Sequence, residues 1–136
     1  MPTSDETEPG LVLAVIAEAL YLANLLILPG LAFLLLLGIW WYRRRNAPPL
    51  AAAHLGQTLA ASLWAGVLLI LANGLILMLG GYRGPQVWVI VITYFTIFHS
   101  LLVVFGAYGL AKAIAGQCWR YPLLGPPLPG GCPSGR

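Results

Sequence analysis

Three long apolar stretches dominate the chain, and charged residues interrupt them at only a few points. The stretches cover residues 25–42, 55–79 and 87–111. Apolar runs of about 18 residues or more are typical of membrane spans. Backbone groups in lipid must be hydrogen-bonded within the protein, as they are in helices. The pattern therefore predicts an all-α integral membrane helical bundle.

The first stretch is too long for one straight span, because apolar residues already begin at Leu11. A single helix over residues 11–42 would be about 48 Å long, against a hydrocarbon core of about 30 Å. Pro29 and Gly30 divide this segment, and proline kinks or ends a helix. We favour one crossing kinked at Pro29, which gives three spans. The alternative is a short N-terminal hairpin, which gives four helices.

Aromatic and basic residues cluster at two points, where they are expected to anchor the chain at the membrane surface. Tryptophan and tyrosine favour the headgroup level, and basic residues favour the cytoplasmic side. One cluster ends the first apolar stretch and the other follows the last. The predicted anchors are Trp40, Trp41, Tyr42, Arg43, Arg44, Arg45, Trp119, Arg120 and Tyr121.

The distribution of positive charge predicts an orientation in the membrane. Lys112 and Arg120 fall on the same side as the arginine cluster, and Arg83 falls in the turn on the opposite side. Because positive residues concentrate in the cytoplasm, and the first segment is taken as one crossing, the N-terminus would lie outside and the C-terminus inside. We expect a location in the bacterial inner (cytoplasmic) membrane.

The composition leaves little room for a second domain. Of the 136 residues, 60% are hydrophobic and 8% are charged. The expected organisation is an acidic N-terminal tail over residues 1–10, a transmembrane helical domain over residues 11–124, and a Pro/Gly-rich C-terminal tail over residues 125–136. The net charge of +3 comes largely from the juxtamembrane arginines, so it does not predict a nucleic-acid partner.

A few polar residues in the apolar segments are candidates for buried or functional positions. His99 lies in the middle of the last span, and an ionisable residue at membrane depth is a functional hypothesis. It could ligate a heme, relay a proton, or pair with Glu18 or Asn73; the simpler interpretation is a neutral histidine bonded to a neighbouring helix. Glu18, Asn73 and His54 are the predicted buried polar residues. His54 is expected at the headgroup level, either as an interfacial cap or as a residue that clamps a loop and bonds to Gln57 or the arginine loop. Its depth differs from that of His99 by some 20 Å, so the two cannot ligate one heme.

Small residues on the last helix predict close helix packing, and the remaining features argue against catalysis. The predicted packing face consists of Gly106, Gly109, Ala113 and Gly116, because small residues let membrane helices approach closely. Cys118, next to the inner interface, could be palmitoylated, and a reduced thiol is the simpler expectation. Sequence motifs of phosphate, zinc or nucleophile chemistry are missing, so we expect no enzyme activity, no metal and no bound cofactor.

Two segments together resemble a known family. The first runs from Trp40 through the arginines to a helix that opens with His54; the second covers residues 111–123, ending in Trp119-Arg120-Tyr121-Pro122-Leu123. They resemble small bacterial membrane proteins of unknown function, grouped with the channel-like subunit of the chloroplast inner-envelope translocon and with a magnetosome membrane protein. The resemblance implies a bundle of three or four helices without enzyme activity.

These features favour a non-catalytic accessory or scaffold subunit of a membrane protein complex. Its partners would be the lipid bilayer and other integral membrane subunits, or further copies of the same chain. One alternative is a heme-binding or proton-relay subunit that uses His99. Another is a translocation or channel component, which rests on the family resemblance alone.

Overall fold

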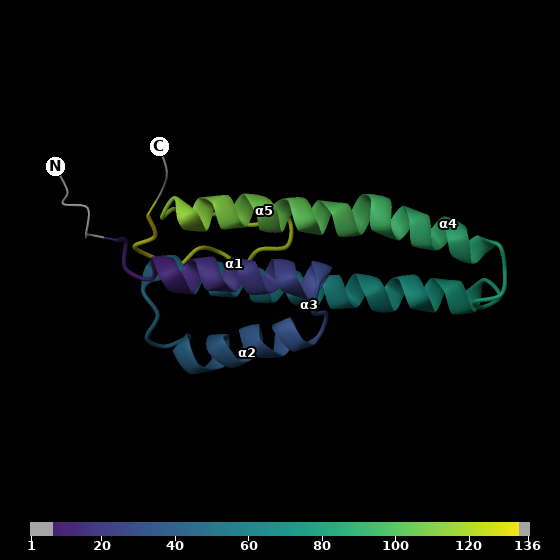
Figure 1. Ribbon diagram of the computed structural model, residues 1–136, viewed down its shortest axis with the longest axis horizontal. Coiled ribbons are helices and arrows are strands. Elements are labelled where there is room, and N and C mark those ends of the chain that lie inside the picture. Colours follow the sequence, from purple (N-terminus) through teal and green to yellow (C-terminus); the bar gives the residue numbers. More distant parts are fainter. Residues whose placement is uncertain (1–6, 134–136) are drawn as a thin grey trace.

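The computed structural model describes residues 7–133, and within this range the regular structure is entirely helical. Figure 1 shows an elongated bundle in which two long antiparallel helical units carry a shorter helical pair along part of their length. The elements are α1 (Leu11–Leu26), α2 (Leu31–Arg43), α3 (Pro49–Met78), α4 (Gln86–Thr93), the π-helical turn η1 (Tyr94–His99) and α5 (Ser100–Ile114). The last three form one continuous helical unit over residues 86–114. The all-helical class predicted from the sequence is confirmed.

The first apolar segment folds as a hairpin. Gly30 has a φ of +88°, a left-handed conformation that glycine adopts without steric cost, and its N–H donates to Asn24 Oδ1 at 2.9 Å. The chain reverses there, so that α1 and α2 lie side by side and Leu36 packs against Ala17. The single crossing kinked at Pro29 is therefore incorrect, and the alternative with four helices and a short N-terminal hairpin is the observed arrangement.

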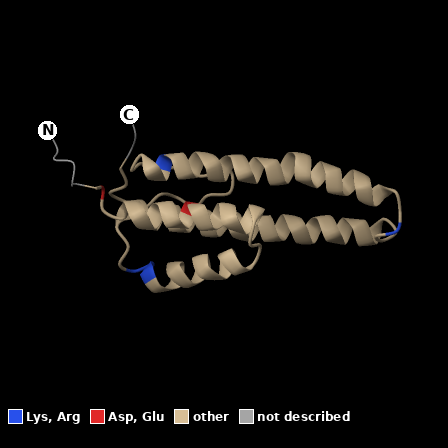
Figure 2. Ribbon diagram, in the orientation of Figure 1, with Lys and Arg blue, Asp and Glu red and all other residues tan. Residues whose placement is uncertain are grey.

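The hairpin also changes where the two ends of the chain lie. Residues 7 and 133 are at the same end of the bundle, together with the start of α3 and the end of α5 (Figure 1). The predicted placement of the N- and C-termini on opposite sides depended on a single first crossing, and this geometry does not support it. Arg43 and Lys112 share that end, whereas Arg83 occupies the turn at the other end (Figure 2).

Two helical units are long and apolar enough to cross a membrane, namely α3 and the unit over residues 86–114. At a rise of 1.5 Å per residue, the 30 residues of α3 measure about 45 Å, which exceeds the hydrocarbon core of about 30 Å by about 15 Å. From Leu59 to its end at Met78, after the polar residues of its first turns, α3 is about 30 Å long and matches the core. With the core placed over this stretch, His54 and Gln57 fall at the headgroup level.

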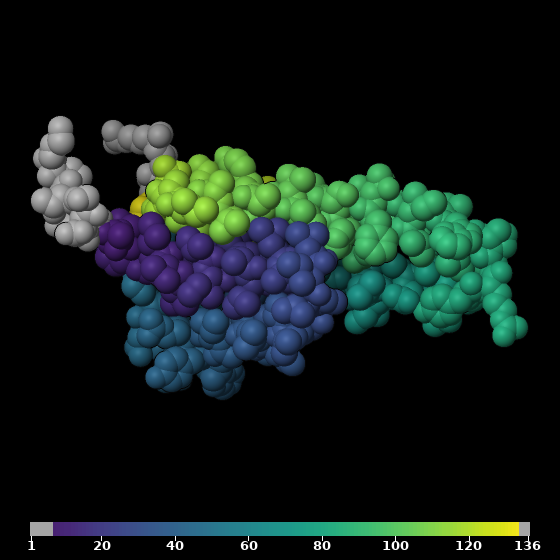
Figure 3. Space-filling view, viewed as in Figure 1, coloured from purple at the N-terminus to yellow at the C-terminus, as the bar shows by residue number. Residues whose placement is uncertain are grey.

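The N-terminal hairpin covers only part of the long helices. In Figure 3 the α1–α2 pair ends near the middle of the molecule, and α3 and α4 continue beyond it. Large apolar side chains on the uncovered part are exposed, among them Ile70, Met78, Trp88 and Ile92. With 16 and 13 residues, α1 and α2 are each shorter than the about 20 residues that a membrane-spanning helix needs.

The segment after α5 is non-helical but packed. Residues 115–133 run back along the bundle and return to the same end, as Figure 1 shows. Gly116, with a φ of +70°, ends the helix, and the Cys118–Cys132 disulfide closes the returning loop. We call residues 115–133 the C-terminal strap. The Pro/Gly-rich part of the strap thus contributes to the packed structure rather than extending from it.

The hairpin makes a direct prediction about membrane topology. In a chain with Cys118 and Cys132 replaced by serine, single cysteines at positions 8 and 45 are expected to react with an impermeant maleimide from one side of the membrane. A cysteine at position 83 is expected to react from the other side, because the turn between α3 and α4 lies at the opposite end of the bundle. Labelling of positions 8 and 45 from opposite sides would restore the single first crossing.

Candidate functional site

A buried carboxyl–imidazole pair joins the N-terminal hairpin to the first long helix. Glu18 lies in the middle of α1 and His54 near the start of α3, and both side chains are 0% exposed. Glu18 Oε1 and His54 Nδ1 are 2.6 Å apart. The other ring nitrogen, Nε2, is 2.9 Å from the carbonyl oxygen of Gln117 in the C-terminal strap. The imidazole therefore connects three parts of the chain.

The hydrogen-bond partners restrict where the protons of this pair can lie. A carbonyl oxygen only accepts, so Nε2 of His54 must carry a proton that it donates to Gln117. One further proton then lies between Nδ1 and Glu18 Oε1. The pair is an imidazolium with a carboxylate or an imidazole with a carboxylic acid, and its net charge is zero in both cases. A neutral, hydrogen-bonded pair is the form in which such groups tolerate burial.

Tyr121 of the strap completes the coordination of the carboxyl group. Its hydroxyl donates to Glu18 Oε2, and burial, followed by the nearby Glu18 charge, raises the pKa of Tyr121. The phenol therefore remains a donor. The backbone N–H of Tyr121 donates to Gln57 Oε1 at 3.0 Å. Gln57 Nε2 in turn donates to the carbonyl of Pro126 at 2.8 Å. Gln57 thus binds the strap at two points. We call Glu18, His54, Gln57, Gln117 and Tyr121 the polar lock.

Two glycines of α5 allow the lock and its surroundings to close. A Cβ atom at position 109 would lie 2.6 Å from Glu18 Oε2, and one at position 106 would lie 2.7 Å from Tyr21 Cε1. Both distances are too short for real contacts, so only glycine fits. Tyr21 also donates from its hydroxyl to the carbonyl of Leu102 at 2.9 Å. Gly106, Gly109 and the buried Ala113 thus lie in a close intramolecular contact between α5 and α1.

The other polar residues singled out in the sequence lie apart from the lock. Asn73 is half-buried in the outer part of α3, where it accepts from the Tyr82 hydroxyl at 2.6 Å and donates to the Leu69 carbonyl at 2.8 Å. His99 pairs with neither Glu18 nor Asn73, and its ring lies 5.1 Å from that of Phe95. His54 is 0% exposed, and its contact with the Gln117 carbonyl corresponds to the loop-clamping alternative, with Gln117 in place of Gln57 or the arginine loop.

The aromatic and basic residues expected at the membrane surface divide into two groups. Trp41 and Tyr42 are 65% and 80% exposed, and Arg44 lies over the Trp41 ring at 4.2 Å, as surface anchors would. Tyr121 is 1% exposed, and Trp119 packs on Tyr108 with ring centroids 4.7 Å apart. Tyr121 is therefore turned into the bundle and cannot lie at the headgroups, whereas Trp119 is half-buried and stays a predicted anchor.

The cysteines also differ from expectation, since Cys118 and Cys132 form a disulfide with Cα atoms 5.9 Å apart instead of remaining separate thiols. Sequence reasoning missed Gln117 and Tyr121 as members of the lock, and it considered Gln57 only as a partner of His54. The sequence indicated only that the polar residues of α3 and of the C-terminal strap would need hydrogen-bond partners. Nothing in their spacing indicated which groups meet.

The lock is suited to holding the chain together. Its two titratable members at the centre are fully buried, and their polar atoms are bonded to one another or to the strap. In residues 7–133 there is no group of three or more His, Cys, Asp or Glu side chains that could hold a metal ion. The arrangement therefore joins the hairpin, α3 and the strap into one unit at the polar end of the bundle.

Comparison with known families adds the identity that the geometry alone does not supply. The model of the magnetosome magnetite crystal formation protein family matches residues 11–128, a range that includes every member of the polar lock. Searches of curated proteins and of solved structures found no match. The match supports the magnetosome part of the sequence resemblance and does not show a relation to the chloroplast translocon. By this match over most of its length, the chain belongs to the magnetosome magnetite crystal formation protein family.

Proposed function

We propose that this chain is a non-catalytic accessory subunit of a membrane protein complex that takes part in the formation of magnetite crystals. The family match supports the process, since its description names magnetosome magnetite crystal formation. The structure supports the mode of action: the fully buried groups of the polar lock hold a scaffold together, and two apolar helical units insert it in the membrane.

One observation favours a subunit over an isolated membrane protein. The lock and the hairpin stabilise one end of the bundle, whereas the outer half of α3 and the facing α4 pack only against each other (Figure 3). Two bare apolar helices can contact lipid or the helices of another subunit. Gly74 lies on this part of α3, and a Cβ atom there would meet open space. Small residues of this kind permit close helix approach in membranes.

The proposed location is the bacterial inner membrane or a membrane derived from it, with both described ends of the chain in the cytoplasm. Arg43, Arg44, Arg45 and Lys112 lie at the end that carries the polar lock, against Arg83 at the other, and positive residues favour the cytoplasmic side. Cytoplasmic thiols are kept reduced. The proposed location therefore requires the Cys118–Cys132 pair, a disulfide in the structure, to be reduced in the cell.

The test is purification from native membranes with a C-terminal affinity tag in a mild detergent, followed by mass spectrometry. Stoichiometric membrane subunits are expected to copurify with the chain. Cells that lack the chain are expected to form magnetite crystals of altered size or shape. A Gly74→Leu variant is expected to recover less of the partner, because the added side chain separates the helices.

A matched control is Gly38→Leu on α2, where a Cβ atom also meets open space. It should retain the partner, since α2 lies on the hairpin and not on the bare helices. A chain that purifies alone, from cells whose crystals are unchanged by its loss, would contradict the proposal. The heme or proton-relay role of His99 and the channel role remain predictions from the sequence.

A further inference from the structure

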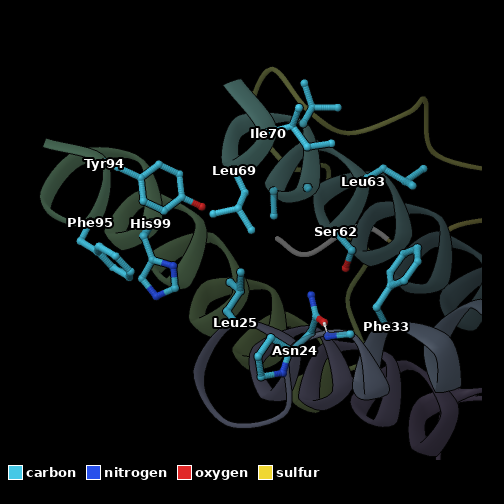
Figure 4. A pocket seen from close by; sticks show the side chains of 15 residues that line it. Asn24, Leu25, Phe33, Ser62, Leu63, Leu69, Ile70, Tyr94, Phe95 and His99 are labelled. Carbon is cyan, nitrogen blue, oxygen red and sulfur yellow. Dashed lines mark hydrogen bonds between the residues drawn. The ribbon is translucent and has the colours of Figure 1, made fainter. Parts of the chain in front are cut away.

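A cavity of about 610 Å³ opens where the tip of the N-terminal hairpin meets the long helices. The hairpin contributes Asn24 and Phe33, the middle of α3 contributes Ser62 and Gly66, and the π-helical turn contributes its aromatic residues. Figure 4 shows these side chains around a common space, with Phe33 on one side and Tyr94, Phe95 and His99 on the other. The volume is within the range of pockets that hold small molecules, about 300–1,000 Å³.

With the hydrocarbon core placed over Leu59–Met78 of α3, the cavity falls at the depth of the core. Its α3 wall runs from Ser62 to Ile70, inside that stretch. The opposite wall is η1, near the middle of the second long unit. Because the hairpin ends here, the cavity is open at the side. An occupant would therefore enter from the lipid phase and not from water.

Polar groups in this apolar setting lack partners. Ser62 is 5% exposed, and its hydroxyl has no hydrogen-bond partner. In Figure 4 the Tyr94 hydroxyl points towards Leu69, and the Ser62 hydroxyl points to the side on which Asn24 lies. Neither Tyr94 nor His99 donates a side-chain hydrogen bond to another residue of the described chain. An unpaired polar group at membrane depth is costly, and a ligand with its own polar atoms would remove that cost.

The local helix geometry gives these side chains their positions. Residues 94–99 form a π-helical turn within an otherwise α-helical unit, and such turns occur frequently at functional sites. The turn brings the rings of Tyr94 and His99 within 6.4 Å of each other on the cavity side. No residue of η1 is fully buried, and Tyr94 and His99 are half-buried beside the cavity.

From this geometry we propose that the cavity binds a membrane-soluble isoprenoid quinone or quinol. The planar ring fits between Phe33 and the aromatic side chains of η1, and its oxygen atoms accept from or donate to Ser62, Tyr94 and His99. The apolar tail leaves through the open side into lipid. The inference goes beyond the accessory function, and it concerns binding only.

Other lipid-phase occupants fit less well. A phospholipid acyl chain has no polar atom at this depth, so Ser62 and His99 would stay unpaired. A sterol-like molecule keeps its hydroxyl at the headgroup level and places only its apolar end here. A helix of another subunit forms its backbone hydrogen bonds internally. It would need polar side chains at the depth of Ser62 and His99 to pair with them. An uncharged ring with two oxygen atoms meets the requirement directly.

The test is a titration of the full chain in lipid nanodiscs with a decyl-substituted benzoquinone, followed by quenching of tryptophan fluorescence. Saturable quenching is expected. Ser62→Ala and His99→Phe should each weaken binding about three- to tenfold, the effect of one hydrogen bond. Gly66→Leu should abolish it, because a Cβ atom at position 66 meets open space and the longer side chain fills the cavity without disturbing the fold.

Gly38→Leu and Gly74→Leu are the controls, since neither residue lines the cavity, and both should bind the quinone as the unmodified chain does. Equal quenching by the quinone in Gly66→Leu would overturn the proposal, as would equal competition by decane, which has no oxygen atoms. Loss of a copurifying protein in Gly66→Leu, without any quinone binding to the unmodified chain, would assign the cavity to a partner helix. The accessory function is tested separately by Gly74→Leu, so each proposal can fail alone.

Discussion

Replacing Glu18 with alanine is expected to lower the free energy of unfolding by about 3–5 kcal/mol, the usual cost of removing one partner from a buried charged pair. The change leaves His54 buried without the group on its Nδ1, and it leaves the Tyr121 hydroxyl without an acceptor. Both orphaned groups lie where water does not reach them. The measurement is an SDS titration of the folded chain in mixed micelles, followed by far-UV circular dichroism.

Two variants separate the contributions within the lock. Tyr121→Phe removes one donor and keeps the ring packing, so a loss of about 1–3 kcal/mol is expected. Glu8→Ala removes an exposed carboxylate at the same end of the bundle and should change stability by less than about 0.5 kcal/mol. If Glu18→Ala were no more damaging than Glu8→Ala, the buried pair would not hold the hairpin and strap in place.

The helices themselves could be predicted from the sequence because their cause is local. Apolar runs that exclude charge must be helical in a membrane, and the boundaries near Pro48-Pro49 and residues 80–85 follow from residues that end or begin helices. The first segment was harder. A proline within an apolar run is compatible with both a kink and a reversal. The choice between them depends on whether α1 packs better on α2 and α3 than on lipid.

The site could be predicted only as a set of residues that need partners. Glu18 and His54 were each identified as polar residues in apolar segments, but 36 positions separate them in the sequence. Whether they meet depends on how α1 is placed relative to α3. The strap was invisible for a related reason. Its prolines and glycines exclude a helix, yet its path depends on hydrogen bonds to Gln57 and His54, which no local pattern encodes.

The second large effect is expected at Gly109, where the introduction of leucine should destabilise the chain by about 3 kcal/mol, at the upper end of the usual cost of overpacking. The new Cβ atom would lie 2.6 Å from Glu18 Oε2 and 2.8 Å from its carboxyl carbon. The α1–α5 contact must then open, or the carboxyl group must leave His54. The same titration in SDS measures the loss.

Gly38→Leu is the matched control, because a Cβ atom there meets nothing within 4 Å. In a helix leucine is intrinsically favoured over glycine by up to about 1 kcal/mol, so this variant should be as stable as the unmodified chain or slightly more so. An equal loss in both variants would mean that the close approach of α5 to Glu18 carries no particular cost.

The double variant Glu18→Ala/Gly109→Leu connects the two predictions. Truncation of Glu18 removes the atoms that the leucine would strike, so part of the overpacking cost should disappear. The double variant is then expected to lose less stability than the sum of the two single variants, with an interaction energy of at least about 1 kcal/mol. Strict additivity would show that Gly109 and Glu18 do not share a contact. A shortfall from additivity would place the carboxyl group of the polar lock against the backbone of α5, as the structure has it.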